Sequence, residues 1–466
     1  MTRAPSVLTS LVKAGFSGLN EAKSRLETGG FDAGDFRDSA NPDLSLKTVD
    51  ALREKDPTAF AKLWAKPTYR NRLVLLTGAS SGLGDFLHRH VDQWKLLASP
   101  LRRVLNQAEY VALMASAIEG KDGDAAVMAL RVSYRRELSR LALWDASSVA
   151  PVDIVHEVAR SLSDLAGAAL ETALNIARLT HGLSADCVPL SIIGMGKAGA
   201  RELNYLSDVD VIYVTEVPEG EDPEAVVAGA HILARDTARY LTEFGIEPGL
   251  WEVDANLRPE GKDGALVRTL ESHLSYYQRW AKDWEFQALI KARPLAGDQD
   301  LGQRYRAALD PLIWEASSRP GFVEQVQRMR ERVSAHIPSH EVDYQIKLGP
   351  GGLRDIEFTI QLLQLVHGAN DDTVRNLDTL GALESLVRAG YVGRVEAAEF
   401  DRSYRTLRVL EHRIQLTHLQ RSHLMPQEEE AIRVLARATK LADNAADLVT
   451  LWRATQRSVR SLHERL

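Results

Sequence analysis

Two short apolar runs joined by a glycine-rich turn constrain this chain more than any other feature of its sequence. Residues 188–194 have the sequence VPLSIIG, the turn continues as MGKAG, and residues 208–214 have the sequence DVDVIYV. An apolar run that ends in glycines, followed by an alternating run, is typical of two strands with a tight connection. Asp222 and Pro223 then predict the start of a helix that Gly245 ends, and residues 248–257 predict a third strand. We therefore expect a small α/β unit over 188–257.

The sequence on both sides of this unit has mainly helical periodicity. Before it, we expect one or two short helices in 1–28, a loop over 29–43, and helices in 45–66, 82–119 and 153–181. Asp153 is the expected N-cap of the last of these helices and Gly182 its stop. After the unit, we expect helices in 271–292, 321–336, 354–368 and 392–420.

This layout predicts an α+β fold that is mostly helical. A small mixed β-sheet unit is expected between an N-terminal helical segment and a C-terminal helical bundle. The expected divisions are an N-terminal helical region over 1–120, a catalytic domain over 121–315 and the bundle over 316–466. A chain of 466 residues is long enough for such a division into several domains.

The glycine turn supports two interpretations. Gly194, Gly196 and Gly199 fit the G-x-G-x-x-G pattern of dinucleotide-binding folds. The motif of that fold also includes an acidic residue about 20 positions later, after a crossover helix. Here Asp208 and Asp210 come early and leave little room for such a helix. The alternative is a turn whose backbone N–H groups approach a phosphate, next to carboxylates that hold a metal ion.

The spacing of the acidic residues favours the metal. Side chains alternate along a strand, so Asp208, Asp210 and Ile212 share one face. The residues expected to point into the core are Val209, Val211 and Tyr213. Two carboxylates on one face repel each other unless a cation lies between them, and hard cations such as Mg²⁺ take oxygen ligands together with substrate phosphate. Asp254, on the third expected strand, is the best candidate for a third ligand. A solvated pair on an edge strand is the simpler alternative.

Several long segments resemble one bacterial family. The segment GMGKAGARELNYLSDVDVIYV, from Gly194, is similar to the signature of glutamine synthetase adenylyltransferase, the enzyme that adds and removes AMP on glutamine synthetase. The segments WEVDANLRPEGKDGALV and KLGPGGLRDIEFTIQLLQLVHG, the latter from Lys347, resemble two further motifs of that family. Asn204, within R-E-L-N, resembles the form found in the adenylyl-removing, N-terminal half.

The resemblance implies that the mixed β-sheet unit is of nucleotidyltransferase type, and it also implies a reaction and a set of roles. The expected reaction is phosphorolysis, in which phosphate takes AMP from an adenylylated tyrosine of glutamine synthetase and leaves as ADP. The chain would then be a fragment of a bifunctional enzyme. Mg²⁺, with Mn²⁺ as the alternative ion, would be held by Asp208, Asp210 and Asp254. The residues expected to contact phosphate or nucleotide are Gly194, Gly196, Lys197, Ser207 and Arg258.

Three other functions stay open from the sequence. An adenylyl-adding enzyme would have the same motifs, a dinucleotide-binding oxidoreductase would need no divalent metal, and a silent regulatory module would tolerate loss of Asp208 and Asp210. The net charge of −7 gives no general attraction to nucleic acid or to an anionic membrane. The single cysteine, Cys187, is expected to be an inert thiol in a buried strand. We expect a cytoplasmic enzyme whose protein substrate is adenylylated glutamine synthetase, with a PII-type protein as a candidate regulator.

Overall fold

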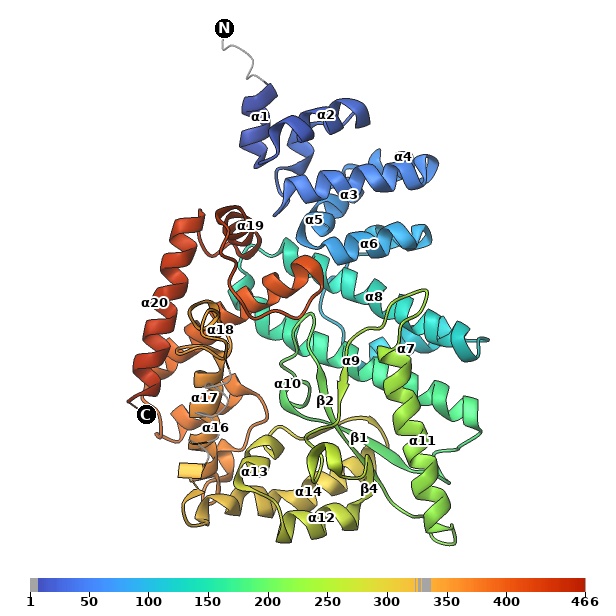
Figure 1. Ribbon diagram of the computed structural model, residues 1–466, viewed down its shortest axis with the longest axis vertical. Coiled ribbons are helices and arrows are strands. Elements are labelled where there is room, and N and C mark those ends of the chain that lie inside the picture. The colour runs from blue at the N-terminus through green and yellow to red at the C-terminus, as the bar shows by residue number, and fades with distance from the viewer. Residues whose placement is uncertain (1–6, 323, 326–327, 329–336, 466) are drawn as a thin grey trace.

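A computed structural model describes residues 7–322, 324–325, 328 and 337–465 of the chain. The helix expected over 321–336 lies largely outside these residues. Helices dominate the described part, and one small sheet lies between the N-terminal and C-terminal groups of helices (Figure 1). The predicted fold class is therefore confirmed.

The N-terminal helices stack toward the sheet from one end of the molecule (Figure 1). Polar side chains cap the N-termini of several of these helices. Asn41 Oδ1 accepts a hydrogen bond from the backbone N–H of Leu44 at the start of α3, and Asn106 caps α7. Their bounds are α1 Val7–Ala14, α2 Leu19–Gly29, α3 Pro42–Lys55, α4 Pro57–Trp64, α5 Pro67–Ala79, α6 Ser81–Arg89, α7 Gln107–Ile118, α8 Gly123–Ser147 and α9 Pro151–His181. The short helices expected in 1–28 are confirmed as α1 and α2.

The sheet has the strand order β3-β2-β1-β5, and β4 also pairs with β2. The strands are β1 Leu190–Gly194, β2 Val209–Thr215, β3 Val253–Asp254, β4 Val267–Thr269 and β5 Arg293–Gly297. Strand β1 is antiparallel to β2 and β5, whereas β2 is parallel to β3 and β4. The three expected strands are confirmed, although the third is much shorter than expected, and β4 and β5 were not predicted.

Both faces of β2 are covered. Val209, Val211 and Tyr213 belong to the core that also contains residues of α8 and α9, whereas Ile212 and Val214 pack in a second core with residues of α12–α14. The predicted alternation along this strand is thus confirmed, but the face that carries Asp210 turns apolar after that residue.

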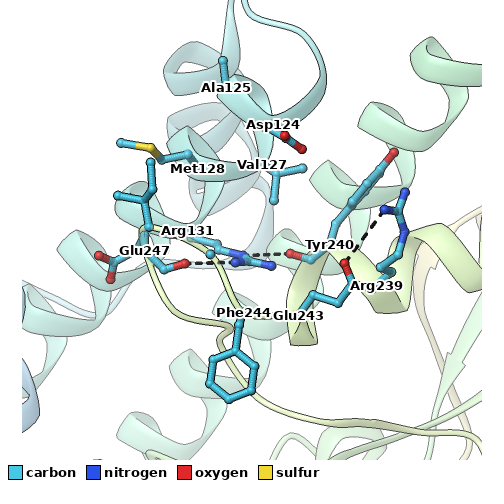
Figure 2. A pocket seen from close by; sticks show the side chains of 12 residues that line it. Asp124, Ala125, Val127, Met128, Arg131, Arg239, Tyr240, Glu243, Phe244 and Glu247 are labelled. Atoms are coloured by element: carbon cyan, nitrogen blue, oxygen red, sulfur yellow. Dashed lines mark hydrogen bonds and ion pairs between the residues drawn. The ribbon is translucent and has the colours of Figure 1, made fainter.

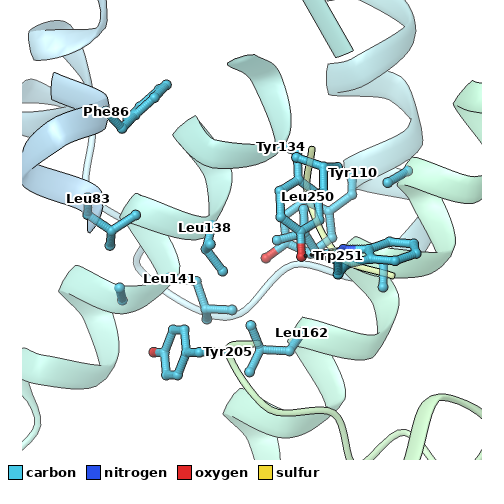
Figure 3. Close-up of a cluster of buried hydrophobic side chains, with 14 of the residues drawn as sticks. Leu83, Phe86, Tyr110, Tyr134, Leu138, Leu141, Leu162, Tyr205, Leu250 and Trp251 are labelled. Carbon is cyan, nitrogen blue, oxygen red and sulfur yellow. Dashed lines mark hydrogen bonds between the residues drawn. The ribbon is translucent and has the colours of Figure 1, made fainter. Parts of the chain in front are cut away.

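One apolar core joins the N-terminal helices to the residues around the sheet. Figure 3 shows Leu83 and Phe86 of α6, Tyr134 of α8 and Tyr205, which precedes β2, within this core. Trp251, next to β3, donates a hydrogen bond from its indole Nε1 to the Tyr134 hydroxyl at 3.1 Å. The segment before the sheet therefore supports the strands directly, and the domain boundaries at 120 and 315 stay predictions.

The remaining helices cover the sheet and form the C-terminal group. Asp222 caps α11 by accepting from the N–H groups of Glu224 and Ala225, as predicted. The bounds are α11 Pro223–Thr242, α12 Leu270–Arg279, α13 Asp283–Leu289, α14 Gln299–Glu315, α16 Leu353–Gly368, α17 Thr379–Arg388, α18 Arg394–His418, α19 Glu429–Thr439 and α20 Ala445–His463. The C-terminal helices have a core of their own, which includes Ile356, Leu410 and Trp452.

Several local predictions were wrong. Helix α11 ends at Thr242, before Gly245, and the helices expected over 82–119 and 271–292 are each divided into shorter ones. Helix α9 begins at Pro151, in the first helical position after Ala150, so Asp153 lies inside the first turn and is not the N-cap. Gly182 does end this helix, in the left-handed conformation. Cys187 is exposed, because β1 begins only at Leu190 and the cysteine belongs to the turn before it. Within the described residues, no helix has the length and apolar character to cross a membrane.

Candidate active site

The carboxylates of Asp210 and Asp254 lie side by side on the parallel strands β2 and β3, where the two residues are register partners. The backbone fixes both: the carbonyl of Asp210 accepts from Met195 N at 2.8 Å, and Asp254 Oδ1 accepts from Asn256 N at 2.7 Å. Burial, then repulsion from Asp254, raises the pKa of Asp210 to about 6. Such a pair of oxygen ligands suits a hard divalent cation, which would relieve the repulsion.

Asp208 has a different environment from the other two acids. It directly precedes β2, and its carboxylate forms an ion pair with Arg421, which follows α18. Within the described residues, no group of three or more His, Cys, Asp or Glu side chains is arranged to hold a metal ion. The donor set of Asp210 and Asp254 fits Mg²⁺ chemically, but Asp208 could join them only after leaving Arg421. The three-carboxylate metal site therefore stays a prediction.

The glycine turn is packed directly against these acids. Gly196 has a φ of 49°, and a Cβ at this position would lie 2.7 Å from Asp210 Oδ2. A Cβ on Gly199 would lie 1.8 Å from the carbonyl oxygen of Lys291. Gly194 ends β1, and its neighbour across the sheet is Val211. The glycines thus allow the backbone to approach both the candidate ligand and the segment before β5.

Lys197 and Arg258 are already bonded within the protein. Lys197 Nζ donates to both carboxylate oxygens of Glu411 at 3.0 Å, and burial lowers the pKa of this lysine to about 7. The Arg258 guanidinium donates to the carbonyl oxygens of Ala255, Lys262 and Gly264 at 2.8–3.0 Å, so it holds the loop after β3 in place. Their expected phosphate contacts, like that of the partly exposed Ser207, stay predictions.

A network of buried charges connects the segment before β2 to α18. Glu202 accepts from Lys291 Nζ at 2.9 Å and from Thr379 N at 2.7 Å. Arg408 of α18 donates to the Asn204 side chain, to Glu411 Oε2 at 2.6 Å and to the carbonyl oxygen of Glu202 at 2.6 Å. Asn204 therefore lies inside a contact that braces the segment before β2 against the C-terminal helices.

A second connection lies beside this network. Arg413 of α18 forms a buried ion pair with Asp145 of α8, and the same carboxylate accepts from the Tyr205 hydroxyl at 2.8 Å. Further along, Leu206 N donates to Gln415 Oε1 at 3.3 Å. Because Asp208 follows two residues later, α18 supports the chain directly up to the candidate ligands.

A cavity of about 400 Å³ opens beside Asp210. Gly196 and Lys197 of the glycine turn line it, together with residues of α16 and of the loop before that helix. The other lining residues are Leu257, Trp284, Gln287, Ala288, Lys291, Lys347, Arg354, Glu357, Phe358 and Gln361. The C-terminal part of the chain thus completes the site. The motif that begins KLGPGGLRD was the one sequence signal that pointed to this contribution.

A second cavity, of about 580 Å³, lies between α8, α11 and the loop after α11, and it shares no lining residue with the first. Figure 2 shows its central cation, Arg131, bonded to two backbone carbonyls. These are the carbonyl oxygens of Tyr240 and Glu247, each 2.9 Å away. The hydrogen bonds of Arg131 therefore go to the backbone, so this side chain holds the fold together. The cavity beside Asp210 is the better candidate site.

Comparison with known proteins gives two family matches. Residues 70–308 match the family model described as glutamate-ammonia ligase adenylyltransferase, and residues 322–466 match the one described as GlnD PII-uridylyltransferase. The first match contains the sheet and all three predicted ligands. The second contains α16 and the loop before it, which line the cavity.

Curated relatives have the same name in several bacteria: bifunctional glutamine synthetase adenylyltransferase/adenylyl-removing enzyme. The one from Leifsonia xyli subsp. xyli is 49% identical over 100% of this chain and 49% of its own length. The one from Streptomyces coelicolor is 44% identical over 100% of this chain and 47% of its own length. The one from Mycobacterium tuberculosis strain H37Rv is 43% identical over 86% of this chain and 40% of its own length. The chain spans about half the length of the relatives it matches.

Proposed function

The chain belongs to the glutamate-ammonia ligase adenylyltransferase family, and from this premise we propose that it removes AMP from glutamine synthetase by phosphorolysis. The observation that carries the proposal is the pair of register partners Asp210 and Asp254 at the edge of a cavity with basic residues on its walls. This arrangement suits transfer of a phosphoryl-linked nucleotide, because carboxylates can hold a metal and cations can hold phosphate oxygens.

In the proposed reaction, an oxygen of inorganic phosphate attacks the α-phosphorus of AMP that is esterified to a tyrosine. The new P–O bond gives ADP, the bond to the tyrosine oxygen breaks, and the phenolate takes a proton from solvent. A bound Mg²⁺ or Mn²⁺ would neutralise charge on the phosphoryl group and on the phenolate, whose pKa is about 10 when free. Asp210 and Asp254 would hold the ion, with Asp208 joining them once Arg421 moves away.

The protein's own residues orient the reactants. The glycine turn places backbone close to Asp210, and the bonds of Arg258 to three carbonyl groups keep the loop after β3 folded beside Asp254. The phosphate nucleophile is already anionic, so the site has little need of a strong base. Asp254 therefore acts as a ligand in this scheme.

Removal is preferred to addition because of Asn204. This residue lies in R-E-L-N, the form that resembles the removing half, and its side chain is bonded to Arg408 and Lys197. Adenylyl addition is the second candidate, since the relatives' printed names include both activities. Glutamine synthetase is the proposed protein substrate in either case, and a PII-type protein is the proposed regulator.

The test uses the 466-residue chain, adenylylated glutamine synthetase, Mg²⁺ and phosphate. Release of ADP that requires both phosphate and metal is the expected result. Incorporation of AMP from ATP into unmodified glutamine synthetase, without ADP release from the adenylylated form, would show the adding activity instead. Undiminished ADP release by Asp210→Asn would contradict the metal site, and the exposed Asp443→Asn is the matched control.

A further inference from the structure

The cations that line the cavity beside Asp210 differ in whether they have partners. Lys197 is bonded to Glu411 and Lys291 to Glu202, so both are neutralised within the protein. The side-chain nitrogens of Lys347 and Arg354, in contrast, have no hydrogen-bond or ion-pair partner among the described residues. Arg354 only lies 5.7 Å from the centre of the Phe358 ring. Two positive charges thus remain available to a ligand.

Backbone contacts hold the loop that carries Lys347 and the start of α16, which carries Arg354. Arg354 N donates to the carbonyl of Lys347 at 2.9 Å, which places the two residues at the same turn. Gly351 has a φ of 76°, and a Cβ there would lie 2.0 Å from the carbonyl oxygen of Gln456, so the loop lies tightly against α20. A Cβ on Gly352 would meet three carbonyl oxygens of the loop at 2.8 Å. The loop is therefore fixed before a ligand arrives, which lowers the entropic cost of binding.

The two cations share their cavity with Asp210, a candidate metal ligand. Arg354 is the second residue of α16, a helix of 16 residues, and Lys347 lies in the loop before it; both line the same cavity as Gly196 and Asp210. The N-terminus of a helix adds a positive electrostatic potential, whereas the first N–H groups of α16 are already bonded to carbonyl groups of the loop. A ligand that reaches both the two cations and Asp210 needs anionic oxygens for the cations and an affinity for a metal ion held by the carboxylate. A phosphoryl group has both properties.

We propose that Lys347 and Arg354 form a binding site for a phosphoryl dianion, either inorganic phosphate or the terminal phosphate of a nucleoside diphosphate. The proposal rests on the proposed function, since it assigns the anion subsite of the same cavity. It places this subsite on the part of the chain that matches the second family model, not on the glycine turn. At about 400 Å³, the cavity has the size of small-ligand sites, which range from about 300 to 1,000 Å³.

Direct binding tests the subsite without the protein substrate. We would titrate the chain with inorganic phosphate and, separately, with ADP in EDTA by calorimetry, using wild type, Lys347→Gln and Arg354→Gln. Each variant is expected to weaken binding about tenfold or more, because a charge-assisted hydrogen bond to phosphate is lost. Arg394→Gln is the matched control, since Arg394 is exposed on α18, and it should bind as wild type does.

Conservative variants and turnover separate binding from folding. Lys347→Arg should restore most of the affinity, whereas a merely structural lysine would not respond in this way. In turnover assays, the two glutamine variants should raise the KM for phosphate by about tenfold and leave the KM for adenylylated glutamine synthetase unchanged. Circular dichroism would check folding, and if one glutamine variant fails to fold, the other provides the comparison with wild type.

The outcomes distinguish this inference from the proposed function. No ADP from wild type under any condition would remove the proposed function, whereas the binding titrations would still report on the subsite. The inference would be overturned if both glutamine variants bound phosphate and ADP as tightly as wild type does, even if wild type releases ADP. It would also be overturned if wild type bound neither anion. Weakening for ADP alone would assign the subsite to the nucleotide, and weakening for both would assign it to the shared phosphoryl chemistry.

Discussion

Replacing Asp210 with asparagine should make the metal-free protein more stable while it abolishes activity. The pKa of Asp210 rises from its ordinary value of 3.8 to about 6, chiefly through burial and then through repulsion from Asp254. Each pH unit of such a rise corresponds to about 1.4 kcal/mol, so the ionised carboxylate costs the folded state ~3 kcal/mol at neutral pH. Asparagine has nearly the same shape and no charge, and it removes this cost.

The sign of the pH dependence follows from proton binding. Between pH 3.8 and about 6 the folded chain binds more protons at Asp210 than the unfolded chain does, so stability falls as pH rises through this window and stays low above it. The advantage of Asp210→Asn over wild type should therefore be ~3 kcal/mol at pH 8 and about half of that at pH 5. Asp443→Asn, on the surface, should show no such difference.

Urea denaturation in EDTA at the two pH values provides the measurement. Added Mg²⁺ should raise the denaturation midpoint of wild type and leave that of Asp210→Asn unchanged, because only a bound ligand shifts the folding equilibrium. If Asp210→Asn is no more stable than wild type at pH 8, the claim that the ionised Asp210 carboxylate destabilises the metal-free folded protein is refuted. For the same reason, the metal concentration needed for half-maximal activity should increase as the pH falls below about 6.

Two further predictions concern groups that support the site. Glu411→Gln should lower the free energy of unfolding by about 3–5 kcal/mol, because Lys197 and Arg408 then stay buried without their counter-charge; a loss below about 1 kcal/mol in thermal unfolding would contradict this assignment. Arg421→Gln should tighten Mn²⁺ binding up to about fivefold, since Asp208 no longer has to leave an exposed ion pair worth up to about 1 kcal/mol; weaker Mn²⁺ binding in a metal titration would show that Asp208 is not a ligand.

The sequence predicted those parts of the site whose signals are local. The alternation around Asp210 and the cap at Asp222 depend on neighbours within a few residues, and both were found. Strand β5 was missed because its five residues include Pro294 and show no alternation, which is typical of an edge strand. The sequence predicts a buried Cys187 because the cysteine directly precedes an apolar run. Strand β1 begins only three residues later, at Leu190, so the cysteine lies in the exposed turn before it.

The contribution of the C-terminal helices was beyond the reach of local patterns. Arg408 reaches Asn204 across 204 residues of sequence, and Arg421 reaches Asp208 across 213. Such pairs depend on how helices pack, which periodicity does not specify. The family motif at Lys347 marked the region without saying which side chains face the cavity. Only the fold shows that the side chains of Lys347 and Arg354 have no hydrogen-bond or ion-pair partner within the part of the chain that the structure describes.

The bracing of the segment before β2 by α18 has a consequence for dissecting the chain. The two family matches, 70–308 and 322–466, suggest a natural place to cut it. A fragment that ends between them would lose Arg408 and Arg413 and leave Asp145 without its counter-ion. Excision there is expected to yield an aggregating product, whereas co-expression of the two pieces should let them reassemble through these charges. For the same reason, positions 145 and 413 should exchange residues only together when homologous sequences diverge.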